Sequence, residues 1–92
     1  MQNANSHIVT HHACEQMAAR GISQDAIQAA LAFGKEVYTR GAIIYALGKK
    51  EAKRAYHEAG DLSRFSGVQV VCSHRGIVLT AYRNRNFRGL RN

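Results

Sequence analysis

Three polar side chains occur at every fourth position near the start of the chain, and among them are a group that can transfer a proton and a group that can bind phosphate. His12, Gln16 and Arg20 lie in the stretch THHACEQMAARGIS, residues 10–23. Positions at this spacing share one face of an α-helix. An imidazole titrates near pH 6.5 and can take or give a proton, and a guanidinium binds phosphate oxygens. The stripe predicts a chemical site, whereas a partly buried histidine bonded to a carbonyl is the structural alternative for His12.

The other reactive side chains have simpler interpretations. His11 lies about 100° from its neighbour around the helix, so we expect a solvated residue of the first turn. Cys14 is interpreted as a small, buried packing residue. A zinc site would have to draw on His11, His12, Cys14, Cys72 and His74. The H-x-C and C-x-H spacings differ from those of paired zinc ligands, and a Cys-His nucleophile lacks an orienting partner, so we predict no metal site.

Basic residues gather toward the end of the sequence. The net charge is +7, and residues 66–92 hold five arginines and no acidic residue. The ending AYRNRNFRGLRN interleaves arginines with aromatic and amide side chains, a pattern typical of phosphate contacts and base stacking. The predicted contacts are Arg83, Arg85, Arg88 and Arg91. A solvated tail that only aids solubility is the alternative interpretation.

Length and hydropathy limit the class of protein. A chain of 92 residues makes one domain, for which we expect a flexible N-terminus over 1–9 and a basic tail over 83–92. No apolar run is long enough to cross a membrane, and the start lacks the basic and apolar segments of a signal peptide. We therefore expect a cytoplasmic protein without membrane contact, whose two distant cysteines are reduced.

The elements that must position the stripe are two helices and two hairpins. Thr10 and Gly21 delimit the first helix, and Ser23 and Gly34 the second. Strand 42–47 belongs to the first hairpin, a short charged helix ending at Gly60 follows, and 68–82 form the second hairpin. The inward residues of that hairpin are predicted to be Val68, Val70, Cys72, Ile77, Leu79 and Ala81. The fold class is α+β: two N-terminal helices packed on a small, about four-stranded antiparallel sheet, with a short helix between the hairpins.

The opening resembles that of a bacterial family described as domain of unknown function 4258. Its typical start reads Ser/Thr-x-His-Ala-x-x-Arg-Met-x-x-Arg-Gly-Ile-Ser/Thr-x-x-x-Ile. The matching residues are Thr10, His12, Ala13, Met17, Arg20, Gly21, Ile22, Ser23 and Ile27. The ending GIVLTAYRNRN is similar to the last strand of that family, where an apolar run leads to Thr, an apolar residue and Tyr. The family in turn resembles RelE-like toxins and barnase-like ribonucleases in architecture, although Gln16 stands where the family commonly has arginine.

This resemblance implies RNA cleavage without metal or cofactor, by attack of the 2′-hydroxyl on the adjacent phosphate. Such chemistry needs a base, an acid and cations beside the phosphoryl oxygens. His12 is expected to be base or acid, Tyr82 a second proton donor, and Arg83 and Arg85 the cations. For Tyr82, packing on the first helix is the structural alternative.

The sequence thus predicts an RNA-binding, toxin-like protein, with endoribonuclease activity as the catalytic hypothesis. Gln16, Arg20, Arg85, Arg88 and Arg91 are the expected substrate contacts. The alternative is a non-catalytic module that binds nucleic acid or an acidic protein such as an antitoxin. Association with the ribosome and the oligomeric state are open at this point.

Overall fold

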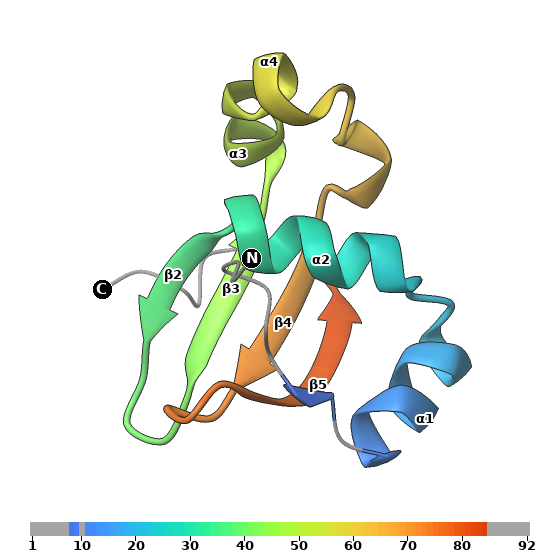
Figure 1. Ribbon diagram of the computed structural model, residues 1–92, viewed down its shortest axis with the longest axis vertical. Helices are drawn as coiled ribbons and strands as arrows, with labels where there is room; N and C mark the ends of the chain where they lie inside the picture. Colours follow the sequence, from blue (N-terminus) through green and yellow to red (C-terminus); the bar gives the residue numbers. More distant parts are fainter. Residues whose placement is uncertain (1–7, 10, 85–92) are drawn as a thin grey trace.

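A computed structural model describes residues 8–9 and 11–84 and, for Ile8, Val9 and His12, the backbone alone (Figure 1). The elements are β1 (Ile8–Val9), α1 (His11–Arg20), α2 (Gln24–Phe33), β2 (Lys35–Tyr38), β3 (Ile43–Leu47), α3 (Lys49–Arg54), α4 (Tyr56–Ala59), the 3-10 turn η1 (Ser63–Phe65), β4 (Val68–Cys72) and β5 (Ile77–Arg83).

Within this part of the chain the strands form one sheet in the order β1-β5-β4-β3-β2. Strands β2 to β5 pair antiparallel, which confirms the predicted α+β class. The sequence favours strand 42–47 as the central one; β3, which corresponds to it, is an interior strand, and the middle of the sheet is β4. β1 pairs parallel with β5 through Ile8↔Ile77 and Val9↔Val78, so two residues of the expected flexible N-terminus are part of the sheet.

The first helix ends and the second begins where the sequence predicts. Gly21 has φ +67°, and the N–H of Ile22 donates to the carbonyl of Met17 at 2.9 Å, a bond that closes the end of α1. The Oγ of Ser23 accepts from the N–H of Ala26 at 3.1 Å and caps α2. The expected cap of α1, Thr10, lies outside the described residues.

The core lies between the helices and one face of the sheet (Figure 1). α2 crosses β3 and β4, and α1 packs along β5. α2 buries Ala26, Ile27, Ala29, Ala30 and Leu31. Because three of these are alanines, the helix backbone can approach the strands closely.

Gly34 ends α2 for a steric reason. Its φ is −69°, so no left-handed conformation is involved. A Cβ at this position would lie 2.5 Å from the carbonyl oxygen of Ala30 and 3.1 Å from the nitrogen of Ala46. The turn from α2 into β2 therefore has room for hydrogen only.

A bulge alters the predicted burial of the second hairpin. The inward positions of β4 are fully buried as expected, namely Val68, Val70 and Cys72. An irregularity just before Cys72 pairs this residue with Val78. Val78 is therefore the fully buried residue of β5, while Ile77 is half-buried and Leu79 is 39% exposed. The prediction for Ile77 and Leu79 is wrong because an extra residue in one strand reverses the alternation of faces; Ala81, beyond the bulge, is buried as predicted.

The charged segment after β3 forms two short helices where one was expected. α3 and α4 meet at Ala55, whose φ and ψ of −82° and −5° leave the regular helix. Ala55 is 3% exposed and belongs to the core, so the bend buries its methyl group. Gly60, with φ +77°, ends α4 as predicted.

Candidate functional site

The polar stripe of α1 lies against the last strand. The opposite side of α1 is buried, with Ala13 at 0% and Met17 at 5% exposure, as the helical spacing predicts. Gln16 is half-buried and Arg20 exposed. The stripe therefore sits at the edge of the packed interface, where side chains can contact both β5 and solvent.

Hydrogen bonds join Gln16 and Arg20 to β5 through Thr80. The Nη1 of Arg20 donates to the Oγ1 of Thr80 at 3.1 Å and to the carbonyl of Ala81 at 2.7 Å. The Oγ1 of Thr80 in turn donates to the Oε1 of Gln16 at 3.0 Å. We call Gln16, Arg20 and Thr80 the arginine network. Each member polarises the next, so the set is held more firmly than isolated surface side chains.

The donors that this network leaves over suit an anion. The two bonds of Arg20 use both hydrogens of Nη1. Among the described residues, no acceptor bonds to its Nε or Nη2, nor to the amide nitrogen of Gln16. The Nε–Nη2 edge of a guanidinium matches two oxygens of a phosphate. A cavity of about 330 Å³ adjoins these donors and is lined by Glu15, Gln16, Ala19 and Arg20.

One acidic side chain shares this cavity. The Oε2 of Glu15 lies 3.2 Å from the Nε2 of His11, and the two side chains are 64% and 89% exposed. An exposed pair of this kind contributes at most about 1 kcal/mol to stability. His11 is thus the solvated first-turn residue that the sequence predicts.

The side chains of the two candidates on β5, Tyr82 and Arg83, point to opposite faces of the sheet. Tyr82 pairs with Gln69 and Arg83 with Val68. Because side chains alternate along a strand, Tyr82 shares the face of Thr80, and Arg83 the face of Ala81. Tyr82 is half-buried and Arg83 exposed. Tyr82 therefore lies on the sheet face of Thr80, whereas Arg83 lies on the face of Ala81, which belongs to the core.

The remaining candidates fall on residues that the structure describes in part or not at all. The backbone of His12 lies in α1, one turn before Gln16, and its side chain is outside the described part. Arg85, Arg88 and Arg91 also lie outside the described residues.

The two cysteines differ from each other in exposure. Cys14 is exposed, so the prediction of a buried packing residue is wrong; its place in α1 is turned from the stripe of Ala13 and Met17 that packs on β5. Cys72 is buried, and burial raises the pKa of its thiol to about 11. No group of three His, Cys, Asp or Glu side chains that can hold a metal ion occurs in the described residues.

Thr80 is the residue that the sequence-based interpretation missed. It lies in the run LTAY, within the ending that is similar to the last strand of the family. A β-branched residue in a strand ordinarily indicates packing, and only the position of α1 reveals that its hydroxyl joins Gln16 to Arg20. The family pattern was the one available signal.

Comparisons with known proteins identify the family. No helix in the described residues is long and apolar enough to cross a membrane. Neither a curated protein nor a solved structure matches the chain significantly. The family described as Domain of unknown function (DUF4258) matches residues 9–83, which include α1, the whole sheet from Val9 onward and the arginine network. With more than half of its length matched, the chain belongs to this family.

Proposed function

We propose that the protein binds RNA and cleaves it without a metal ion, in the manner of RelE-like toxins and barnase-like ribonucleases. The arginine network is the observation that carries this proposal. It presents an oriented guanidinium edge beside an open cavity, on the same helix stripe as His12. A net charge of +7 favours a polyanionic substrate.

The proposed reaction is an internal transfer at phosphorus. The 2′-oxygen forms a bond to the phosphorus atom while the bond to the 5′-oxygen breaks, leaving a 2′,3′-cyclic phosphate and a 5′-hydroxyl. His12 takes the proton of the 2′-hydroxyl, and Tyr82 gives a proton to the departing oxygen. Arg20 and the amide of Gln16 donate to the phosphoryl oxygens as their charge rises.

The other arginines have a separate role in this proposal. Arg83 leaves the opposite face of β5, so it holds flanking phosphates together with Arg85, Arg88 and Arg91 rather than stabilising the reacting one. These contacts set affinity and its dependence on salt.

A second candidate function is a binding module without catalysis, for nucleic acid or for an acidic protein such as an antitoxin. The observation that favours it is the neutral amide of Gln16, which accepts from Thr80 at the place where arginine is common in the family. An amide donates to an anion without adding positive charge, so it stabilises the transition state less than arginine would.

The test uses purified protein and RNA in the presence of EDTA. We expect cleavage products that end in 2′,3′-cyclic phosphate. His12→Ala should lower the rate by a factor on the order of 10² or more, with little change in RNA affinity, as for loss of an acid or base. His11→Ala is the matched control, because it removes the adjacent, solvated imidazole and should keep the rate within about twofold.

Other outcomes separate the two candidates. Full activity in His12→Ala would overturn the proposed mechanism. RNA binding without cleavage, both on free RNA and with translating ribosomes, would support the binding module. Gln16→Arg adds a cation to the stripe, and an increased rate would identify this chain as a weakened member of a catalytic group.

A further inference from the structure

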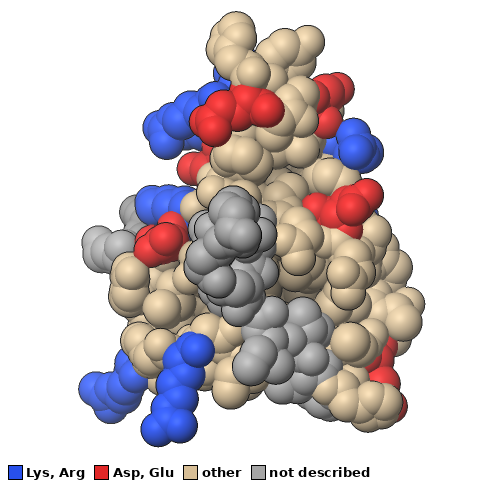
Figure 2. Space-filling model, in the orientation of Figure 1, with Lys and Arg blue, Asp and Glu red and all other residues tan. Residues whose placement is uncertain are grey.

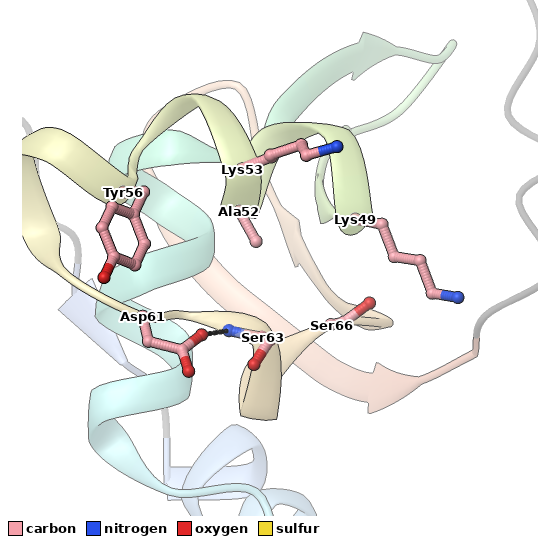
Figure 3. Close-up of a pocket in the computed structure, with 7 residues that line it drawn as sticks. All are labelled: Lys49, Ala52, Lys53, Tyr56, Asp61, Ser63 and Ser66. Atoms are coloured by element: carbon pink, nitrogen blue, oxygen red, sulfur yellow. Dashed lines mark hydrogen bonds between the residues drawn. The ribbon is translucent and has the colours of Figure 1, made fainter.

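All lysines of the sequence line two adjoining cavities at one end of the sheet. The first cavity, of about 440 Å³, is lined by Lys49, Ala52, Lys53, Tyr56, Asp61, Ser63 and Ser66 (Figure 3). The second, of about 460 Å³, is lined by Lys35, Gly48, Lys49, Lys50, Glu51, Ser66 and Gly67. Lys49 and Ser66 line both, so the two cavities are neighbours. We call them the lysine cavities.

Tertiary structure gathers these residues from distant segments. Lys49 and Lys53 are four residues apart on α3 and extend on one side of the first cavity (Figure 3). Lys35 pairs with Ala46 at the start of β2, close to the point where β3 leads into α3. The 3-10 turn η1, which packs on α3, supplies Ser63 and leads into Ser66.

The positive charge of these lysines is available to a ligand. Lys35, Lys49, Lys50 and Lys53 are all exposed. Within the described part of the chain, none of their ammonium groups has a carboxylate at ion-pair distance. The lining of the two cavities thus contains four lysines and two carboxylates, those of Glu51 and Asp61. Both carboxylates accept hydrogen bonds from the backbone.

The two carboxylates stabilise the backbone that lines the cavities. The Oε1 of Glu51 accepts from the N–H of Gly48 at 3.0 Å, at the start of α3. The Oδ1 of Asp61 accepts from the N–H of Ser63 at 2.9 Å. Bonds from Ser63 keep the pKa of Asp61 below its usual value, so this residue stays ionised.

An aromatic ring stands at the other end of the first cavity. Tyr56 is 58% exposed, and its hydroxyl points toward the side where Asp61 lies (Figure 3). The ring of Tyr56 and the amines of Lys49 and Lys53 thus border one hollow. Single-stranded RNA alternates a flat base with a charged phosphate, and proteins bind such strands by combining stacking rings with cationic grooves. An acidic peptide would match the lysines but would leave the ring without a counterpart.

We propose that the lysine cavities bind single-stranded RNA, with a base on Tyr56 and phosphates on the lysines. This inference rests on the proposed function only for the identity of the ligand, and it assigns a second contact surface away from the arginine network. Lysines make point contacts without base readout, so binding here is insensitive to sequence and sensitive to salt.

Amine acetylation tests the proposal directly, because lysines occur nowhere else in the chain. The probe is a 2′-O-methyl oligouridylate of about twelve nucleotides, which lacks the attacking hydroxyl and cannot be cleaved. At saturating probe we expect acetylation of Lys49 and Lys53, read by mass spectrometry, to slow by about fivefold or more. The α-amino group of the chain serves as the internal reference.

A matched pair of variants supplies a second readout. Lys49→Gln with Lys53→Gln removes two charges at the cavities, and Arg40→Gln with Arg75→Gln removes two in the hairpin loops at the opposite end of the sheet. That end lies at the lower left of Figure 2, where basic side chains project without acidic neighbours in this view. The lysine variant should reduce the slope of log affinity against log salt by about 1.4, at roughly 0.7 for each lost contact. The arginine variant should change it by less than about half of that.

The outcomes distinguish this inference from the proposed function. Binding of the probe by the wild-type chain, with unprotected lysines and an unchanged slope in the lysine variant, would overturn the lysine cavities and leave the proposed function intact. No binding of the probe at all would overturn both. Protection by polyglutamate but not by the probe would overturn RNA as the ligand in favour of an acidic protein.

Discussion

The arginine network and the lysine cavities present positive charge in opposite ways. In the network, Arg20 is bonded to Thr80 and to the backbone of β5, so its remaining donors point in a set direction. In the cavities, the described structure gives the ammonium groups no partner that would orient them. Both regions can attract phosphate, but only the first does so with donors in place before the ligand arrives.

This difference separates the two tasks of an RNA-cleaving protein. Stabilising the charge that develops on a reacting phosphate requires donors whose positions do not have to reorganise. Holding the rest of the strand requires charge that adapts to any sequence and conformation. In the proposed function, the reacting phosphate therefore belongs to the arginine network, and part of the flanking strand belongs to the lysine cavities.

Exchanging the two kinds of cation should break the comparison most sharply. Arg20→Lys keeps the charge but loses the planar set of donors, so we expect cleavage to fall by a factor on the order of 10 to 100. Lys49→Arg should leave RNA affinity within about twofold, because the proposed phosphate contacts at the cavities depend on positive charge and not on the geometry of the donor. Arg40→Lys in an exposed loop is the control for the first change. Equal effects of Arg20→Lys and Arg40→Lys would mean that the network has no directional role.

Removing the bridging hydroxyl should have a smaller effect on both stability and rate. Thr80→Val keeps the shape but deletes the bonds to Gln16 and Arg20, while the bond from Arg20 to Ala81 remains. We expect a loss of ~1 kcal/mol in the free energy of unfolding and a fall in Tm of about 4–8 °C. Cleavage should fall by about tenfold, since the guanidinium is less well held.

Thr39→Val is the matched control for this variant. Among the described residues, its hydroxyl bonds only to Ala42, within the loop between β2 and β3. A similar loss of stability with no loss of cleavage is expected there. If the two variants lower cleavage equally, the effect of Thr80→Val comes from stability alone.

The smallest effect concerns the acidic wall of the lysine cavities. Asp61→Asn retains an acceptor for the N–H of Ser63 and removes one negative charge, so RNA affinity at low salt should rise by less than about threefold.

The wild-type pKa of Asp61 is lowered in the folded state, so its carboxylate favours folding above about pH 4 and loses this contribution as the pH falls through the lower folded value. Acid unfolding followed by circular dichroism should show a shallower loss for Asp61→Asn. An identical pH profile would contradict the role of Ser63.

Local signals predicted much of the fold. Gly21 and Ser23 favour particular backbone conformations, and the C-terminal end of α1 and the start of α2 lie where these residues indicate. The error in the second hairpin arose because the pairing of its two strands sets which residues are buried. The bulge opposite Cys72 is a property of strand pairing, and it reversed the expected faces of Ile77 and Leu79.

The candidate site was predictable to the extent that it lies on one helix. Spacing alone placed Gln16 and Arg20 together, and the structure adds their partner on β5. The lysine cavities could not be predicted from the sequence, because the hairpin of β2 and β3 separates Lys35 from the lysines of α3 along the chain. In the sequence, KKEAKR reads as an ordinary solvated helix, and nothing local indicates that a distant lysine lies beside it.

Gly34 links packing to charge in a way that affects how variants should be interpreted. Because it has no side chain, its Cα can lie close to the carbonyl oxygen of Ala30 and to the backbone of Ala46, and the next residue is Lys35. The direction in which that lysine leaves the sheet is thus a by-product of a steric contact. A substitution at Gly34 would displace a charge without changing any charged residue. If the lysine cavities bind RNA as proposed, a mutational scan would record a binding defect at Gly34, although this residue does not line the cavities.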